Sequence, residues 1–158
     1  MTDLKDLYAI AKKRGSKIVS AESCTAGLLA ACLTEMPGSS AFFEQGYITY
    51  SNRSKISVLG VDKKVLKKYG AVSEEVAKQM AEGALNRSMG TIAISITGIA
   101  GPGGSDYKPE GLVCIALAKK NGETRIETVE YGPLGRNNIR SSAVTKAIKL
   151  LYEELSVS

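Results

Sequence analysis

The chain has 158 residues, of which 44% are hydrophobic and 23% charged, a composition typical of one globular domain. Its 21 basic and 16 acidic residues give a net charge of +5 at pH 7, which permits anionic ligands, but aromatic residues are not interleaved with the basic ones as in base-stacking surfaces. The absence of histidine and of any CxxC pair among the three cysteines excludes the usual zinc sites.

Helix and strand patterns alternate in the first half of the chain. In chain order, the predicted elements are a helix from an Asp3 cap to residue 14, a strand over 17–21, a helix over 25–35, a strand over 41–50, a helix over 53–58, a helix opening at Ser73, strands over 91–97, 111–118 and 124–131, and a helix over 137–155. The helix over 25–35 is apolar nearly all round, which predicts deep burial.

This order of elements predicts an α/β fold, a three-layer α/β/α sandwich with a mixed, mostly parallel sheet, in one domain over residues 1–158. In such folds, ligands bind beyond the carboxyl ends of parallel strands. Ser23 and the loop after Thr97 both follow predicted strands, so we expect them in one crevice.

A possible nucleophile lies in the segment 21–27, where Ser23 and Cys24 follow a short apolar run. Because histidine is absent, covalent chemistry there needs a lysine, a tyrosine or a carboxylate as base. Two structural interpretations stay open: Ser23 or Thr25 as a helix cap, and Cys24 as a small buried apolar residue.

Lys55 and Tyr50 are the candidates to replace histidine. A lysine that is partly desolvated in a cleft loses affinity for its proton and can act as a base toward a serine hydroxyl. Tyr50 then relays the proton or orients the lysine. The alternatives are a tyrosine that packs in a strand and a lysine on the surface.

Two further features point to an anionic ligand. The glycine-rich segment 97–105 lacks the pattern of a P-loop or a dinucleotide fingerprint, but its free N–H groups can bind an anion, unless it is only a surface connection. Arg136 and Arg140 share one face at the start of the last helix, and they form either a phosphate clamp or pairs with surface acids.

Four motifs in order resemble the nicotinamide-nucleotide amidase family, also known as the CinA C-terminal domain or competence/damage-inducible family. They are Ala-Glu-Ser-Cys-Thr at 21–25, Thr-Tyr-Ser-Asn-x-x-Lys at 49–55, Gly-Ala-Val-Ser-Glu-Glu at 70–75 and Thr-Gly-Ile-Ala-Gly-Pro at 97–102. The resemblance extends from about residue 5 to 155, in what looks like the stand-alone amidase form. Ala26 departs from the family, which usually has a second glycine there.

The resemblance implies hydrolysis of nicotinamide mononucleotide to nicotinic acid mononucleotide and ammonia, with Ser23, Tyr50 and Lys55 as catalytic residues. Ser23 is expected to attack the carboxamide, with Lys55 as base either directly or through Tyr50. The residues expected to bind the substrate are Glu22, Cys24, Thr25, Thr97, Gly98, Gly101, Arg136 and Arg140.

We expect no metal and no cofactor, a small-molecule nucleotide as ligand, a cytoplasmic location without membrane contact, and a homodimer, because a small domain exposes hydrophobic helix faces. Two other functions stay open. The first is a nucleotide-binding module without turnover, since family membership does not guarantee activity. The second is a basic protein associated with nucleic acid.

Overall fold

The computed structural model describes residues 4–157, and within them five strands form one sheet in the order β2-β1-β3-β4-β5. The strands are β1 (Ile18–Glu22), β2 (Phe43–Ile48), β3 (Ile92–Gly98), β4 (Leu112–Lys119) and β5 (Arg125–Glu130). β1 runs parallel to both β2 and β3, whereas β4 runs antiparallel to β3 and β5. Only β4 therefore opposes the other described strands, which confirms the mixed, mostly parallel sheet.

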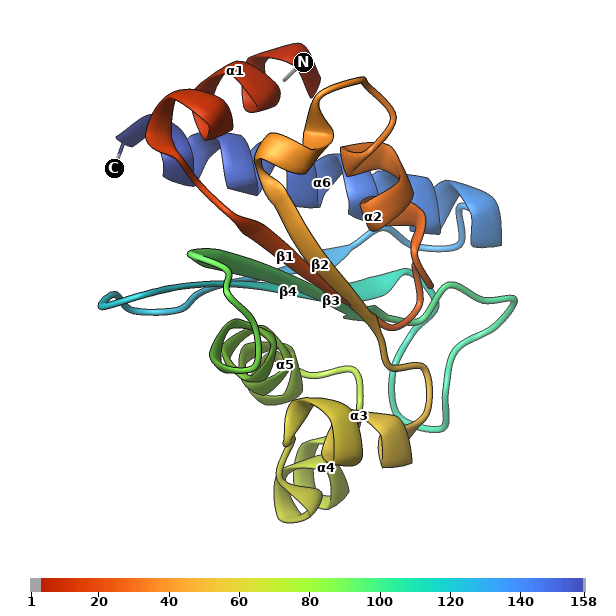
Figure 1. The fold of residues 1–158 in the computed structure, drawn as a ribbon. Helices are drawn as coiled ribbons and strands as arrows, with labels where there is room; N and C mark the ends of the chain where they lie inside the picture. Colours follow the sequence, from red (N-terminus) through yellow and green to blue (C-terminus); the bar gives the residue numbers. More distant parts are fainter. Residues whose placement is uncertain (1–3, 158) are drawn as a thin grey trace.

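Helices cover both faces of this sheet, as predicted. They are α1 (Leu4–Arg14), α2 (Leu28–Leu33), α3 (Asn52–Leu59), α4 (Lys63–Tyr69), α5 (Glu74–Asn86) and α6 (Arg136–Val157), with a short 3₁₀ turn at Ser39–Ala41. Figure 1 shows α1, α2 and α6 on one side of the strands and α3, α4 and α5 on the other. In residues 4–157, no helix combines the length and apolar character that crossing a membrane requires.

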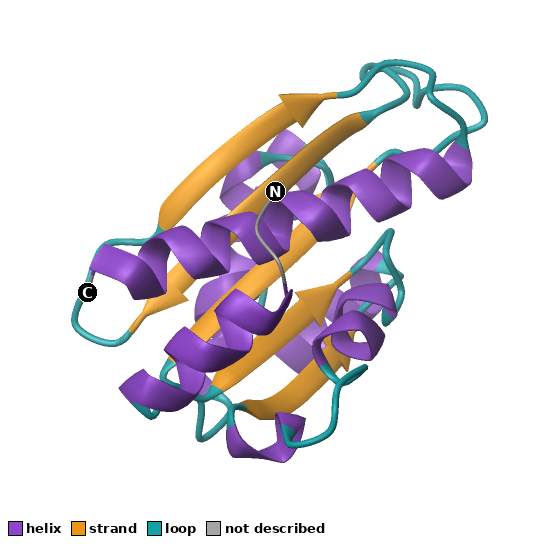
Figure 2. Cartoon of the chain, turned by 90° about the horizontal axis from the view of Figure 1, so that it is seen from above, coloured by secondary structure: helices purple, strands orange, loops and turns teal. Residues whose placement is uncertain are grey.

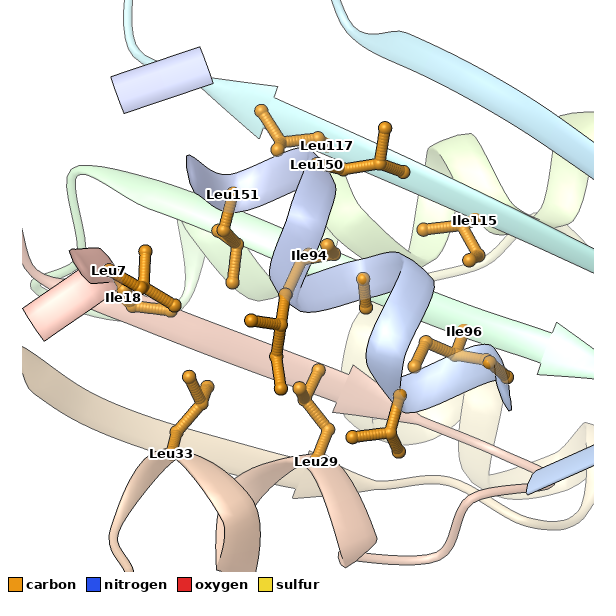
Figure 3. Packing of buried hydrophobic residues seen from close by; sticks show 14 of the residues in the cluster. Leu7, Ile18, Leu29, Leu33, Ile94, Ile96, Ile115, Leu117, Leu150 and Leu151 are labelled. Atoms are coloured by element: carbon orange, nitrogen blue, oxygen red, sulfur yellow. The ribbon is translucent and has the colours of Figure 1, made fainter. Parts of the chain in front are cut away.

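The hydrophobic core is divided by the sheet into two clusters. Between the sheet and α1, α2 and α6, side chains such as Ile94, Leu29 and Leu151 are fully buried and point toward one another (Figure 3). On the opposite face, Met80 of α5 packs in the cluster that contains Ala93. Ile94 and Ala93 are neighbours in β3, so strand alternation supplies one side chain to each cluster.

The structure corrects the prediction for the second helix. α2 begins at Leu28 rather than at residue 25, because residues 24–27 form a turn in which Ala26 has a φ of 46° and Gly27 a φ of 98°. The expected deep burial is also wrong, since Leu28 is 38% exposed. A helix of this length buries only one stripe, here Leu29 and Leu33.

Two other differences lie near the termini of helices. No element was predicted between residues 58 and 73, where the structure has α4; its lysines are exposed, and its first turn is capped by the Asp62 carboxylate. The predicted cap Asp3 lies outside the described residues. By contrast, Ser51 and Ser73 cap α3 and α5 through their hydroxyls, as their positions predict.

The carboxyl ends of β1 and β3 meet at one end of the sheet. The backbone N–H of Ser23, just after β1, donates a hydrogen bond of 2.9 Å to the carbonyl of Ile96 in β3. Figure 2, which looks down on the helices, shows α6, the longest helix, lying across the strands and beginning at this end. The turn over residues 23–27, which carries the candidate nucleophile Ser23 and is called the nucleophile turn below, is thus brought together with the glycine-rich loop and the start of α6.

Candidate active site

A cavity of about 340 Å³ opens at this end of the sheet. It collects residues that are far apart in the sequence, from the ends of β1 and β3, from the segment between β2 and α3, and from the start of α6. The predicted site residues that line it are Ser23, Cys24, Tyr50, Lys55, Thr97, Gly98, Gly101 and Arg136. The crevice expected from the strand order is therefore present.

Lys55 directly contacts Ser23. Its side chain extends from α3 and is 1% exposed, and its Nζ donates to the Ser23 Oγ at 2.8 Å. The same Nζ donates to the backbone carbonyls of Thr49 at 2.7 Å and of Tyr50 at 3.2 Å. The hydroxyl and the amine are thus in hydrogen-bond contact without an intermediary.

Burial lowers the pKa of Lys55 from its ordinary value of 10.5 to about 8, because the cavity wall desolvates the ammonium. At that value roughly a tenth of the molecules carry a neutral amine at pH 7. A neutral amine has two hydrogens and one lone pair. The carbonyls of Thr49 and Tyr50 take the two hydrogens, which directs the lone pair to the hydroxyl of Ser23.

Cys24 lines the cavity as a neutral thiol. It is 5% exposed, and burial raises its pKa to about 11. A Cβ on Gly98 would lie 3.1 Å from the Cys24 Sγ, so the absence of a side chain at 98 leaves room for the sulfur. A thiol with so high a pKa is a poor nucleophile at neutral pH, so Ser23 is the better candidate for the nucleophile of this turn.

Tyr50 and Arg136 meet at the mouth of the cavity. The Tyr50 side chain is 60% exposed, and its hydroxyl accepts a hydrogen bond of 3.1 Å from Arg136 Nη2. Arg136 Nη1 donates to the carbonyl of Gly101 at 2.7 Å. The Tyr50 ring thus faces the side where Arg136 lies, and its backbone carbonyl, rather than its hydroxyl, contacts Lys55.

Three residues expected to bind the substrate are not among the described residues that line this cavity: Glu22, Thr25 and Arg140. Glu22 and Thr25 are fully buried, and the Thr25 hydroxyl donates to Glu22 Oε1 at 2.7 Å. Arg140 Nε and Nη2 donate to the carbonyls of Cys24 and Thr25 at 3.0 and 3.2 Å. Thr25 belongs to the nucleophile turn, and the side chains of Glu22 and Arg140 bind this turn.

Sequence reasoning missed a further part of the wall, formed by Ala71 and Val72. The Thr97 hydroxyl, which is buried, donates to the carbonyl of Ala71 at 2.8 Å and ties this segment to β3. The signal was present in the motif at 70–75, one of the four that carry the family resemblance, but apolar side chains give no chemical hint of a site.

Comparison with known proteins agrees with this architecture. The profile of the CinA C-terminal domain matches residues 3–155. The chain belongs to this family. A CinA-like protein of Akkermansia muciniphila is 50% identical over 138 residues, which are 87% of this chain and 33% of that protein. One of Chlorobium phaeobacteroides is 49% identical over 149 residues, 90% of this chain and 35% of that protein.

Solved structures of CinA proteins share the fold closely. The competence/damage inducible protein CihA of Agrobacterium tumefaciens is 43% identical, with a TM-score of 0.88 and 96% of each chain covered. A CinA superfamily protein of Klebsiella pneumoniae is 33% identical, with a TM-score of 0.93 over 98% of this chain and 96% of its own. The chain spans about a third of the length of the curated relatives above.

Proposed function

We propose that this CinA domain hydrolyses the carboxamide of nicotinamide mononucleotide to give nicotinic acid mononucleotide and ammonia. The observation that carries the proposal is the buried contact of 2.8 Å between Lys55 Nζ and Ser23 Oγ. The four family motifs support the choice of substrate. The cavity of about 340 Å³ lies at the lower end of the range for small-molecule sites, which is about 300–1,000 Å³.

The first chemical step forms an acyl-enzyme. The neutral amine of Lys55 takes the proton of Ser23, and the Ser23 Oγ attacks the carboxamide carbon. The resulting ammonium returns a proton to the amide nitrogen, the C–N bond breaks and ammonia leaves. The carbonyls of Thr49 and Tyr50 hold the amine in place throughout this exchange.

The second step hydrolyses the ester. Water enters where ammonia left, Lys55 accepts its proton, and the ester bond to Ser23 breaks as the proton returns to the Ser23 Oγ. In both steps an oxyanion develops next to the turn. No oxygen of the described residues accepts a hydrogen bond from the N–H of Cys24 or Thr25, so both are candidates to stabilise it.

The phosphate of the mononucleotide is assigned to the mouth of the cavity. Arg136 is exposed there, and its guanidinium is held by two neutral partners, the Tyr50 hydroxyl and the Gly101 carbonyl. A phosphate forms charge-assisted hydrogen bonds with arginine that are stronger than such neutral contacts. The adjacent segment 101–103 brings glycine backbone close to the same position.

The test is release of ammonia from nicotinamide mononucleotide by the purified protein, with the Ser23→Ala variant as control. Ammonia from the wild type and none from the variant, which still binds the nucleotide in calorimetry, is the expected result. Nucleotide binding without ammonia from the wild type would instead identify a binding module. An active Ser23→Ala variant would contradict the assignment of the nucleophile.

A further inference from the structure

The carboxylate of Glu22 is fully buried at the end of β1, immediately before the nucleophile. Both of its oxygens are used. Oε1 accepts the hydroxyl of Thr25 at 2.7 Å and the backbone N–H of Leu29 at 2.8 Å, and Oε2 accepts the N–H of Ala30 at 3.1 Å. Glu22 therefore binds the first turn of α2, where backbone N–H groups have no partner within the helix.

Arg140 holds the same segment through its carbonyl groups. From α6, its Nε and Nη2 donate to the carbonyls of Cys24 and Thr25. Glu22 thus satisfies donors that follow the nucleophile turn, while Arg140 satisfies acceptors within it. Together they hold the segment between Ser23 and α2 from two sides: Arg140 binds two of its carbonyls, and Glu22 binds the Thr25 hydroxyl and the first N–H groups of α2.

The turn needs such support because its backbone is strained. Ala26 has a φ of 46°, in the left-handed region that residues with a Cβ rarely adopt, and Gly27 follows with a φ of 98°. Such a conformation persists only where the surroundings over-determine it. A buried carboxylate is itself costly unless hydrogen bonds compensate it, and here the compensation comes from the turn and from α2.

We propose that Glu22 and Arg140 are positioning residues, which hold the turn 23–27 so that the Ser23 hydroxyl stays in contact with Lys55, and that neither touches the substrate. This positioning role rests on the proposed function only for the identity of the substrate. The reactivity of Ser23 can be measured without that substrate. A misplacement of about 1 Å can cost roughly 100-fold in rate. Release of the turn therefore lowers kcat and leaves KM unchanged.

The variants are Glu22→Gln, Arg140→Ala and Arg140→Lys, with Tyr8→Phe as the matched control. Tyr8 donates to the carbonyl of Leu33 at 2.6 Å, so the control removes a buried hydrogen bond from the other end of α2. In Glu22→Gln, the amide keeps one acceptor oxygen. Its NH2 group, which is a donor, then faces the N–H of Ala30 or Leu29, which is also a donor. We expect kcat to fall about tenfold to 100-fold in Glu22→Gln and Arg140→Ala, less in Arg140→Lys, and to stay unchanged in Tyr8→Phe.

A second measurement does not depend on the substrate. Phenylmethanesulfonyl fluoride reacts with an activated serine, forming an Oγ–S bond and breaking the S–F bond, while the proton goes to the Lys55 amine and fluoride leaves. Mass spectrometry gives the rate of labelling at Ser23. We expect this rate to fall with kcat in the Glu22 and Arg140 variants, whether or not nicotinamide mononucleotide is the substrate.

The outcomes separate the two proposals. Labelling of the wild type that is slowed by Arg140→Ala, without release of ammonia, rejects the substrate and keeps the positioning role. A raised KM with unchanged kcat and labelling overturns the positioning role, because the residue then binds the substrate. The positioning role is also overturned if kcat falls in step with thermal stability in every variant, the control Tyr8→Phe included. A wild type that neither labels nor hydrolyses overturns both.

Discussion

The cavity has two halves that differ in exposure. In one half, Ser23 is 8% and Lys55 is 1% exposed, and their hydrogen bonds lead to each other and to backbone carbonyls. In the other half, Tyr50 is 60% exposed and Arg136 lies at the surface. The Ser23 hydroxyl and the Lys55 amine thus lie in a buried region and bind to each other and to the backbone. The Arg136 guanidinium lies where solvent and ligands can reach it.

Under the proposed function, this difference separates the residues of the chemical step from the residue that binds the phosphate. In the buried half, the low dielectric lowers the pKa of Lys55. It also raises the free-energy cost of a polar group that has no hydrogen-bond partner. In the exposed half, contacts of Arg136 are easily exchanged for those of a ligand, because water competes with them. Changes in the first half should therefore act on kcat, and changes in the second on KM.

After Ser23→Ala, the largest effect is expected for Lys55→Met, which removes the base and keeps much of the side-chain volume. We predict that kcat for ammonia release falls by about 1,000-fold, within the usual contribution of a general base, with KM little changed. Lys67→Met on the exposed face of α4 is the matched control and should keep full activity. A Lys55→Met variant with more than a tenth of the activity would contradict the role of the amine.

Arg136→Ala tests the exposed half. Loss of charge-assisted hydrogen bonds to phosphate, at about 1.5–3 kcal/mol, should raise KM for the mononucleotide roughly tenfold to 100-fold and change kcat little. For nicotinamide riboside, which lacks the phosphate, the variant and the wild type should have the same KM. The exposed Arg53→Ala serves as control. A fall in kcat with unchanged KM would place Arg136 in the reactive half instead.

The pH dependence reports on the buried half. The amine acts as a base only when it is neutral, so kcat/KM should rise about tenfold per pH unit below 8 and level off above it. The midpoint follows from the pKa of about 8 that burial gives Lys55. Initial rates of ammonia release between pH 6 and 10 measure it. A flat profile across this range would be incompatible with a lysine base.

The smallest effect concerns the strained turn. Ala26→Gly removes a Cβ from a residue with a φ of 46°, and the left-handed penalty of about 1 kcal/mol should raise the melting temperature by roughly 2–4 °C. Ala31→Gly in α2, where the backbone is helical, should lower it by a similar amount. Thermal unfolding of both variants checks the contrast, and equal shifts of the same sign would show that the turn is not strained.

Much of the fold follows from the sequence because it depends on periodicity and on local capping. The run from Ile92 to Ile96 alternates β-branched isoleucines with the small residues alanine and serine, as suits a buried central strand, and Ser51 and Ser73 precede helices that they cap. The turn at 24–27 could not be predicted from periodicity and capping. There, the apolar pattern of a helix continues, but Ala26 and Gly27 have positive φ values and the carbonyls of Cys24 and Thr25 bind Arg140 instead of helix N–H groups.

The site was predictable in its reactive residues and less so in its supporting ones. Ser23 and Lys55 were candidates because a serine can react without histidine when a lysine is its base, and because the family motifs contain both residues; the structure brings them into contact. Arg136 and Arg140 share one face of a helix in the sequence and were expected to act alike. One helical turn separates them in space, so the first reaches the mouth of the cavity and the second reaches the carbonyls behind the nucleophile.

The most direct test of the account is the titration of Lys55 itself. In protein labelled with ¹³C at the lysine Cε, the Lys55 resonance is assigned by its absence in Lys55→Met and followed from pH 6 to 11. The account predicts a midpoint near 8, well below the ordinary value of 10.5, because the amine is desolvated beside Ser23. A midpoint at the ordinary lysine value would contradict it, since the amine would then be protonated wherever the enzyme works.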